Sequence, residues 1–536
     1  MQPQAPALPP LTPARRRAIS TLMAVIVLIV VMDITIINVA LNPIQLSLGA
    51  SNAELQWSLD TYLITFAAFI FTGGVCADRF GRKKVLVAGL LIFGIASTLA
   101  AYAADVESLI LWRAVMGVGA AVIPTVTLAV IMATFPPPER PKAIATWAAA
   151  AGVAFAVGPI LGGLLLESFW WGSIFLINAP LVLISVVLIA LWVPESRSPM
   201  KSRFDPLGVL LSIVAIGLLV YGIVVGGEDN AWLSLPVLGS IVAGLVLIAV
   251  LVLVESRMAS PSLDVTLLRS SRFSAGTAAI ALCFFALIGA IFVIQFYYQA
   301  VRGYSPMQAG LLMLPMGVGT VLTSARSPKL AARFGPRTVV AAGAVVMALS
   351  FVLTTLMDRQ TGVWLLIVAQ LLFGIGWGCI MAPATGSLMS VVPLPKAGAG
   401  QAVTQTARQV AGALGVAVIG SVLGSVYRSS LGDAVDVLPA GLRDEAGDSI
   451  GGTLRAIASA GLTDGRATLV DAGMEAYLTG MRAAMIVAIV VVLGAAVISL
   501  RWLPKQLPPP PMPPAPPAPP ATSTEQPQSV AAKPVG

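Results

Sequence analysis

Three charged residues lie inside long apolar segments in the first half of this sequence, where a charge is costly. Asp33 interrupts VVMDITIINVAL, Asp60 lies in WSLDTYL, and Arg113 lies in LWRAVMGVGAA. A charge at the centre of a bilayer costs about 3 kcal/mol on insertion scales, so such residues tend to face a cavity and to have a function. Burial favours the neutral form of a carboxylic acid, whereas a neighbouring arginine favours its ionised form. An acid whose surroundings alternate between the two sides of a membrane can therefore carry a proton across it.

Asp33 is the first candidate for this chemistry. It follows Arg17 by sixteen residues, which is about 24 Å along a helix and places it beyond the midplane of a bilayer. We expect Asp33 to be the main proton-coupling carboxylate and Arg113 to adjust its protonation. The alternative is a static Asp33–Arg113 ion pair that only holds two helices together.

Asp60 is open to two interpretations. It lies beside Trp57 and Tyr62, and an acid among aromatic rings suits a lipophilic cation through charge attraction and cation–π contact. A second proton-coupling role belongs to the same interpretation. Alternatively, Asp60 is solvated near the outer interface, where Trp57 and Tyr62 would be belt residues. The expected substrate cavity comprises Asp60, Trp57, Tyr62, Asn38 and Gln405.

The composition is that of a membrane protein. Hydrophobic residues make up 57% of the chain and charged residues only 10%, and the mean hydropathy is +0.91. Soluble proteins carry about 25% charged residues. The net charge of +8 comes from Lys and Arg in short loops between apolar segments. We therefore expect the lipid bilayer, and not nucleic acid, as the partner of this chain.

Missing residue types exclude several classes of function. The chain has no histidine, so it offers neither a His-based proton relay nor a His-metal site. Its three cysteines lie in or beside apolar segments, without metal-ligand spacing or a disulfide framework. It has no G-x-x-x-x-G-K-[ST] motif for ATP and no paired carboxylates or nucleophile–base set. We expect no enzyme activity, no metal and no cofactor.

Fourteen segments are long and apolar enough to cross a bilayer as helices. They are 18–41, 57–77, 85–104, 109–134, 143–166, 173–193, 207–226, 235–254, 273–299, 308–327, 338–357, 363–389, 397–425 and 481–500. Lys and Arg gather in alternate loops, and the first four loops on the other side carry none. This bias follows the positive-inside rule. It predicts a multi-pass protein of the cell membrane with both termini in the cytoplasm and the first apolar segment retained.

A short motif occurs twice, after the second and the tenth predicted helices. ADRFGRK spans 77–83 and AARFGPR spans 331–337, and such similarity indicates a duplicated half. The predicted fold class is an all-α polytopic membrane protein with two six-helix bundles and two inserted helices. Its expected parts are a cytoplasmic tail (1–17), the first bundle (18–200), the inserted helices (204–254), the second bundle (265–502) with an external loop (428–480), and a Pro-rich disordered cytoplasmic tail (503–536).

Six segments together resemble a known family. GGVCADRFGRKK resembles the signature loop of the major facilitator superfamily, carried here by Gly74, Asp78, Arg79, Gly81, Arg82 and Lys83. MDITIINVAL, LWRAVMGVGAA, AFAVGPILGG, SIFLINAP and RQVAGALGVAVIGS resemble its fourteen-helix drug:proton antiporter branch, and most closely exporters of quaternary ammonium compounds. The resemblance extends from residue 30 to residue 421. It implies the major facilitator fold, with Asp33 and Arg113 lining a central cavity.

The resemblance also implies a part for the loop 73–84 in conformational change. Asp78 would contact the positive N-terminus of the helix that begins near residue 397, a dipole contact worth about 0.3–2 kcal/mol. Gly74 would permit close helix approach and Gly81 a tight turn. The alternative is a basic loop that only sets the topology.

The fifth predicted helix carries an antiporter-type motif. Ala154, Gly158 and Gly162 are spaced by four and form a small-residue stripe, and Pro159 bends the helix. With Gly163, these residues would form a sealing interface between the two halves. Ordinary helix packing without a role in transport is the alternative.

The thirteenth predicted helix is unusually polar. Gln401, Gln405 and Arg408 share one face, which we expect to contact protein or the cavity rather than lipid. Exporters of quaternary ammonium compounds often carry further acids in helices ten and thirteen. This chain has Thr320, Thr404, Gln405 and Gln409 there.

These observations favour a proton-coupled antiporter that exports lipophilic, cationic drugs or related amphipathic compounds by alternating access. The alternatives are export of a self-made antibiotic or another metabolite, and a uniporter or importer of the same fold. The expected partners are a small lipophilic substrate, protons and the bilayer, and the expected assembly is a monomer.

Overall fold

The computed structural model describes residues 11–50, 52–197, 206–228, 232–257, 267, 270–392, 397–461 and 465–506, and these ranges contain helices and no strand. Most of the two predicted tails and the predicted boundaries at 204 and 265 lie outside the described residues. The helices are α1 (Pro13–Leu48), α2 (Asn52–Phe80), α3 (Arg82–Ala101), α4 (Val106–Thr134), α5 (Arg140–Ser168), α6 (Ser173–Leu176), α7 (Asn178–Trp192), α8 (Pro206–Glu228), α9 (Leu235–Arg257), α11 (Ser271–Phe296), η1 (Tyr297–Val301), α12 (Pro306–Leu311), α13 (Leu314–Phe334), α14 (Pro336–Thr355), α15 (Val363–Met389), α16 (Ala397–Leu431), η3 (Gly432–Val437), α17 (Ala440–Asp448), α18 (Ile450–Ala460) and α19 (Arg466–Trp502).

Each of the fourteen apolar segments falls on a helix or a consecutive helix pair, but a count of fourteen spans is not confirmed. Among the described residues, twelve helices are long and apolar enough to cross a membrane, and the bent α5 makes a thirteenth. The apolar part of α9, Leu235–Leu251, is shorter than a full span. The fold class is therefore a polytopic helical membrane protein, as predicted.

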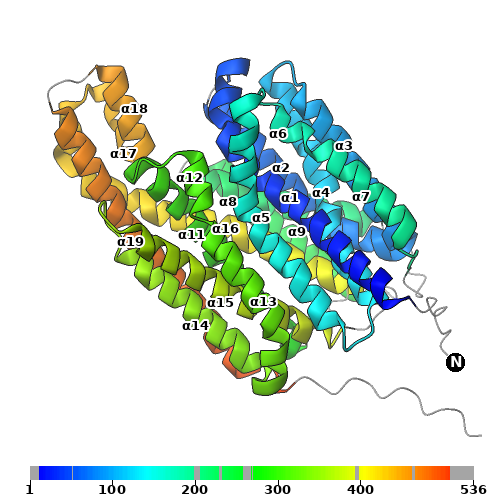
Figure 1. The fold of residues 1–536 in the computed structure, drawn as a ribbon. Coiled ribbons are helices and arrows are strands. Elements are labelled where there is room, and N and C mark those ends of the chain that lie inside the picture. Colours follow the sequence, from blue (N-terminus) through cyan, green and yellow to red (C-terminus); the bar gives the residue numbers. More distant parts are fainter. Residues whose placement is uncertain are drawn as a thin grey trace, which may run out of the picture.

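The helices form two bundles (Figure 1), and the helix pairings inside the first bundle repeat in the second. In the first bundle α1 packs on α5, α2 and α3 pack on α4, and α3 packs on α7. In the second bundle α11 packs on α16, α13 and α14 pack on α15, and α14 packs on α19. The two sets of pairings correspond: α1 to α5 of the first bundle match α11, α13, α14, α15 and α16 of the second, and α6–α7 matches α19 as the sixth member. This correspondence is what a duplicated six-helix unit requires.

The two copies of the basic motif also share a backbone conformation. Gly81 links α2 to α3 with φ of 111°, and Gly335 links α13 to α14 with φ of 82°. A side chain is strained at positive φ, so glycine suits both turns. At Gly81 an added Cβ would also lie 2.6 Å from the Glu195 carboxylate. Both glycines therefore serve the same tight helix-to-helix turn in the two bundles.

The helix that carries Arg113 begins with a capping box. Asp105 accepts a hydrogen bond from the Ser108 backbone N–H at 2.8 Å, and the Ser108 hydroxyl reaches back to the Asp105 backbone. The hydrogen bonds that the exposed Asp105 carboxylate accepts from Ser108, led by the one from the backbone N–H, hold its pKa below the ordinary value. The cap fixes where α4 starts and thus the depth of Arg113, eight residues later.

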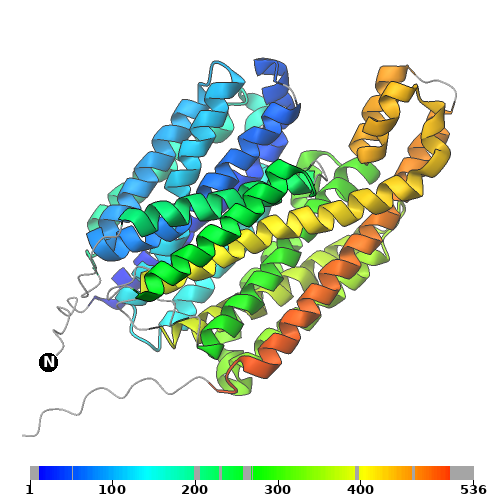
Figure 2. The same ribbon diagram turned by 180° about the vertical axis from the view of Figure 1, so that it is seen from behind.

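The inserted helices α8 and α9 form a hairpin that lies across the junction of the two bundles (Figure 2). The two helices pack on each other, and α8 packs on α2 of the first bundle and on α16 of the second. The Trp57 ring of α2 stacks on Tyr221 of α8, with centroids 6.0 Å apart. Trp232 donates a hydrogen bond to Ser421 of α16 at 3.2 Å. The hairpin thus contacts both halves.

The small-residue stripe of α5 packs within its own bundle rather than between the halves. An added Cβ at Gly158 would collide with Thr35 of α1 and lie 2.9 Å from the Met32 carbonyl oxygen, and Gly162 likewise faces Ile36. The contact with the other half uses the adjacent face of α5. There, Gly152 lies against Thr320 and Pro159 against Gly310. A neighbouring position on the helix changes the face by about 100°, which separates the two contacts.

The bend in α5 has a local cause. The helix bends by 44° between Arg140–Ala154 and Val157–Ser168. Proline lacks the N–H that would bond the carbonyl four residues earlier, and its ring clashes with that carbonyl. For Pro159 that carbonyl belongs to residue 155, inside the break, so Pro159 accounts for the bend.

Replacing Gly158 by alanine should destabilise the protein, because α1 would have to move away from α5. Overpacking of this kind costs about 1–3 kcal/mol. We expect a lower midpoint of thermal unfolding for Gly158→Ala, measured on the detergent-purified protein by size-exclusion chromatography after heating. The matched control is Gly163→Ala, whose added Cβ would lie 3.4 Å from Met307, an ordinary contact. Equal midpoints for the two variants would contradict the proposed packing.

Candidate functional site

Asp33 and Arg113 form an ion pair in the interior of the first bundle. Arg113 Nη1 donates to Asp33 Oδ2 at 2.8 Å, and the two side chains are 0% and 1% exposed. Arg113 Nε also donates to the Ser58 backbone carbonyl at 3.2 Å. The guanidinium lies 4.2 Å from the centre of the Tyr62 ring. Removing one partner of such a pair leaves a buried charge uncompensated, which costs about 3–5 kcal/mol.

Asn178, at the start of α7, is the second partner of Asp33. Its Nδ2 donates to Asp33 Oδ1 at 2.9 Å and to Ser97 Oγ at 3.1 Å, and Ser97 donates to the Phe175 carbonyl at 2.8 Å. Each carboxylate oxygen of Asp33 therefore accepts one hydrogen bond, one from a cation and one from a neutral amide. Sequence reasoning missed Asn178. The available signal was a buried polar residue in the otherwise apolar SIFLINAP.

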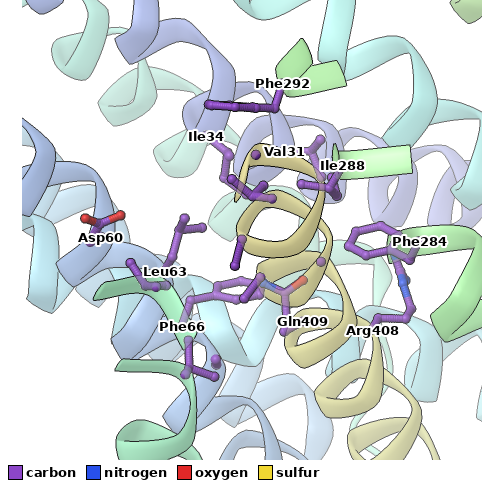
Figure 3. Close-up of a pocket in the computed structure, with 18 of the residues that line it drawn as sticks. Val31, Ile34, Asp60, Leu63, Phe66, Phe284, Ile288, Phe292, Arg408 and Gln409 are labelled. Atoms are coloured by element: carbon purple, nitrogen blue, oxygen red, sulfur yellow. The ribbon is translucent and has the colours of Figure 1, made fainter. Parts of the chain in front are cut away.

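A cavity of about 430 Å³ lies between the two bundles, and its wall is mostly apolar. Of the described residues that line it, only Asp60 from α2 and Arg408 from α16 carry a charge. Figure 3 shows these two on opposite sides of a group of apolar and aromatic side chains, with Gln409 between them. Volumes of about 300–1,000 Å³ are typical of sites for drug-sized molecules. The arrangement suits an amphipathic ligand.

Two of the five residues expected in the substrate cavity line it, namely Asp60 and Gln405. Trp57 and Tyr62 are not among its lining residues. Trp57 stacks on Tyr221 and is 41% exposed, whereas Tyr62 is fully buried against Arg113. The side chain of Asn38 lies outside the described part of the chain.

Asp33 and Arg113 lie behind the cavity wall and do not line it. The face of α1 that lines the cavity carries Val27, Val30, Val31 and Ile34. This is a helical i, i+3, i+4, i+7 pattern, and it turns Asp33 away from the cavity toward α4 and α7. The resemblance had implied that both residues line the cavity. The structure instead places the ion pair and the cavity on two faces of the same turns of α1.

Elements outside the two duplicated units complete the cavity wall. Val220 and Val224 come from the inserted helix α8. Ser449 and Ile450 come from the predicted external segment. A hydrogen bond of 2.6 Å between the hydroxyls of Tyr427, on α16, and Thr453 holds this segment against α16. No motif in the sequence marked these residues, because they are apolar or lie in a segment without a recognisable site.

The signature loop is held within the first bundle. Asp78 accepts a hydrogen bond from Arg82 at 2.9 Å, and Lys83 Nζ donates to the Ala190 carbonyl at 2.8 Å. The Glu195 carboxylate accepts from the Lys83 backbone N–H at 3.2 Å. Arg79 lies 5.6 Å from the Phe80 ring. The contact of Asp78 with the helix that begins at residue 397 stays a prediction, although α2 does pack on α16.

The described residues contain no group of three or more His, Cys, Asp or Glu side chains that could hold a metal ion.

Arg408 has a distinctive environment. Its Nη1 donates to Gln405 Oε1 at 2.5 Å, and its guanidinium lies 4.4 Å from the centre of the Phe284 ring. The site thus consists of a buried ion pair, a separate cavity, and one charge on each side of that cavity.

Several characterised proteins are similar to this chain over most of its length. The multidrug efflux pump LfrA of Mycolicibacterium smegmatis is 34% identical over 493 residues, which are 91% of this chain and 96% of that protein. The tetracenomycin C resistance and export protein of Streptomyces glaucescens is 31% identical over 93% of this chain and 94% of its own length. The methyl viologen resistance protein SmvA of Salmonella typhimurium is 32% identical, over 85% and 92% respectively.

Solved structures agree on the fold. The human organic anion transporter MFSD10 has a TM-score of 0.59 at 14% identity and covers 90% of this chain and 100% of its own. The proton:xylose symporter XylE has a TM-score of 0.58 at 16% identity, with 92% and 98% coverage. The family model of the Major Facilitator Superfamily matches residues 23–416. With its duplicated six-helix bundles and the cavity between them, the chain belongs to the Major Facilitator Superfamily of membrane transporters.

Proposed function

We propose that this chain exports lipophilic, mainly cationic compounds in exchange for protons, by alternating access. The observation that carries the proposal is a buried carboxylate, Asp33, that shares its helix turns with the wall of a cavity containing a second acid, Asp60. The printed names of the relatives, which describe multidrug efflux and resistance to methyl viologen, support export of such compounds. Both termini would lie in the cytoplasm, and the protein would act as a monomer in the cell membrane.

Asp33 has partners that suit a proton carrier. Arg113 stabilises only the ionised carboxylate, whereas the Asn178 side chain has a donor and an acceptor. The Asn178 Oδ1 atom is buried and has no hydrogen-bond partner among the described residues. After rotation of the amide it can accept a hydrogen bond from a protonated Asp33. Asn178 can therefore serve both protonation states of the acid.

Protonation of Asp33 can change the shape of the cavity through a movement of α1. Val30, Val31 and Ile34 line the cavity within one turn of Asp33. When Asp33 is neutral, its attraction to Arg113 is lost, and α1 is free to shift relative to α4. The same shift changes the cavity wall. Each charge that crosses 100 mV supplies about 2.3 kcal/mol, or roughly a fifty-fold gradient, which is sufficient to drive export.

Asp60 is the group that would attract a cation. It is 8% exposed and lines the cavity, where apolar and aromatic residues predominate. Export of a self-made antibiotic is the second candidate, and the tetracenomycin C export protein from Streptomyces favours it. Both candidates use the same cavity and the same proton site.

Replacing Asp33 by asparagine should abolish uphill export and preserve exchange. Asparagine keeps the shape of the side chain but cannot take up a proton at this position. We expect Asp33→Asn in proteoliposomes to show no substrate accumulation driven by a pH gradient, yet to exchange internal for external labelled substrate without a gradient. Asp105→Asn is the control, since asparagine also caps a helix. Normal uphill export by Asp33→Asn would refute the assignment, and loss of both activities would favour a static ion pair.

Replacing Asn178 by leucine should reduce uphill export while exchange continues. Leucine has a similar size but neither donates nor accepts, so Asp33 loses its neutral partner. We expect a reduction of about ten-fold, the size of one hydrogen bond to a charged group. Ser185→Ala on the same helix is the control, because the one hydrogen bond that Ser185 donates within the described part of the chain goes to the Leu181 carbonyl of its own helix. Equal loss of export and exchange would show that Asn178 has a structural role only.

Replacing Asp60 by asparagine should weaken the binding of cations selectively. We expect the dissociation constant of a lipophilic cation to rise about ten-fold and that of a neutral compound of similar size to stay within two-fold. Tryptophan-fluorescence quenching of the purified protein measures both constants. Unchanged affinity for the cation would place Asp60 outside the substrate site.

A further inference from the structure

The cavity contains a cation of its own, and the export of cations does not account for it. Arg408 lies on α16, across the cavity from Asp60 on α2 (Figure 3). A fixed arginine repels a positively charged ligand. Its presence in the cavity wall therefore indicates a second kind of ligand group, one that is negatively charged or accepts hydrogen bonds.

The guanidinium of Arg408 is only partly satisfied by the protein. Gln405 Oε1 accepts one hydrogen bond from Nη1 at 2.5 Å, although an arginine has five N–H donors. The Nε atom is buried and has no hydrogen-bond partner in the described chain. No carboxylate lies within ion-pair distance of Arg408 among those residues. Buried donors without an acceptor are costly, so an acceptor from within the cavity would stabilise them.

The surroundings of Arg408 restrict the shape of that ligand. Phe284 lies 4.4 Å from the guanidinium, and its ring centroid lies 5.9 Å from that of Trp377, at an angle of 42°. Both rings line the cavity. Arginine binds planar acceptors such as carboxylates through its fork of donors. An aromatic molecule with an acidic or strongly accepting substituent matches this combination.

We propose that Arg408 forms an acceptor subsite for the carboxylate, phenolate or carbonyl group of an aromatic substrate, opposite the acid Asp60. The cavity then takes zwitterionic aromatic compounds as well as simple cations. A zwitterion places its positive group toward Asp60 and its negative group toward Arg408, with its rings against Phe284 and Trp377. The inference rests on the proposed export function, because it concerns the same cavity.

Two dyes that differ only in one group test this subsite. Rhodamine 110 has a free carboxylate at neutral pH, and rhodamine 123 is its methyl ester with the same cationic ring system. Fluorescence anisotropy with the purified full-length protein gives both dissociation constants without a proton gradient. We expect Arg408→Gln to weaken binding of rhodamine 110 about ten-fold or more and to leave binding of rhodamine 123 within two-fold.

Three comparisons make the result decisive. Arg408→Lys keeps the charge but loses the planar fork, so it should recover part of the affinity for rhodamine 110. Gln409→Met changes a neighbouring lining residue without changing charge, and it should affect both dyes alike. Asp60→Asn should weaken both dyes, because both carry the cation.

Some outcomes would overturn the inference. It fails if Arg408→Gln weakens both dyes equally, if it leaves rhodamine 110 unchanged, or if the unmodified protein does not bind rhodamine 110. Rhodamine 123 bound with normal affinity shows that the variant is folded. If the unmodified protein binds both dyes and transports neither, the proposed export function fails while the subsite stands. If the unmodified protein exports rhodamine 123 but Arg408→Gln does not weaken binding of rhodamine 110, the subsite fails while the proposed export function stands.

Discussion

The ion pair between Asp33 and Arg113 is the interaction on which the arrangement of the first bundle depends. It joins α1 to α4 through two side chains that are almost completely buried. Asn178 adds α7 to the same cluster. The turn of α1 that carries Asp33 also packs on α5, because Gly158 of α5 lies against Met32 and Thr35. The next residue of α5, Pro159, contacts Gly310 of the second half. A continuous chain of packed contacts thus runs from the buried acid to the junction between the halves.

The same geometry separates two tasks that a single acid would find difficult to combine. A carboxylate that binds a proton reproducibly needs fixed partners, whereas a wall that admits varied ligands needs an apolar and adaptable surface. Here Asp33 has fixed donors on one face of α1, and aliphatic side chains form the other face. The charges that do face the cavity, Asp60 and Arg408, lie on different helices. Each can therefore act on a ligand without neutralising the other through direct contact.

Much of this architecture could be predicted from the sequence, because burying charge and spanning a bilayer impose strict requirements. The apolar segments, the repeated basic motif and the charged residues Asp33 and Arg113 followed from those requirements. The remainder depended on side-chain direction and on neutral groups. Asn178 carries no charge, Trp57 lies on the outer face of its helix, and the stripe at Gly158 faces α1 and not the other half. The count of fourteen spans is not confirmed, because the apolar part of α9 is short and α5 is bent.

The hairpin of α8 and α9 gives the cavity a wall that belongs to neither repeat. In the duplicated helices, residues of the cavity wall such as Val27 and Val30 also belong to the packed core of their bundle. Val220 and Val224 belong to α8, which packs on α9, on α2 and on α16. Residues outside the two six-helix units, and outside the helices that carry Asp33 and Arg113, therefore shape one side of the cavity. With an inserted hairpin of this kind, substitutions on α8 change the shape of the cavity while the Asp33–Arg113 ion pair keeps all of its partners.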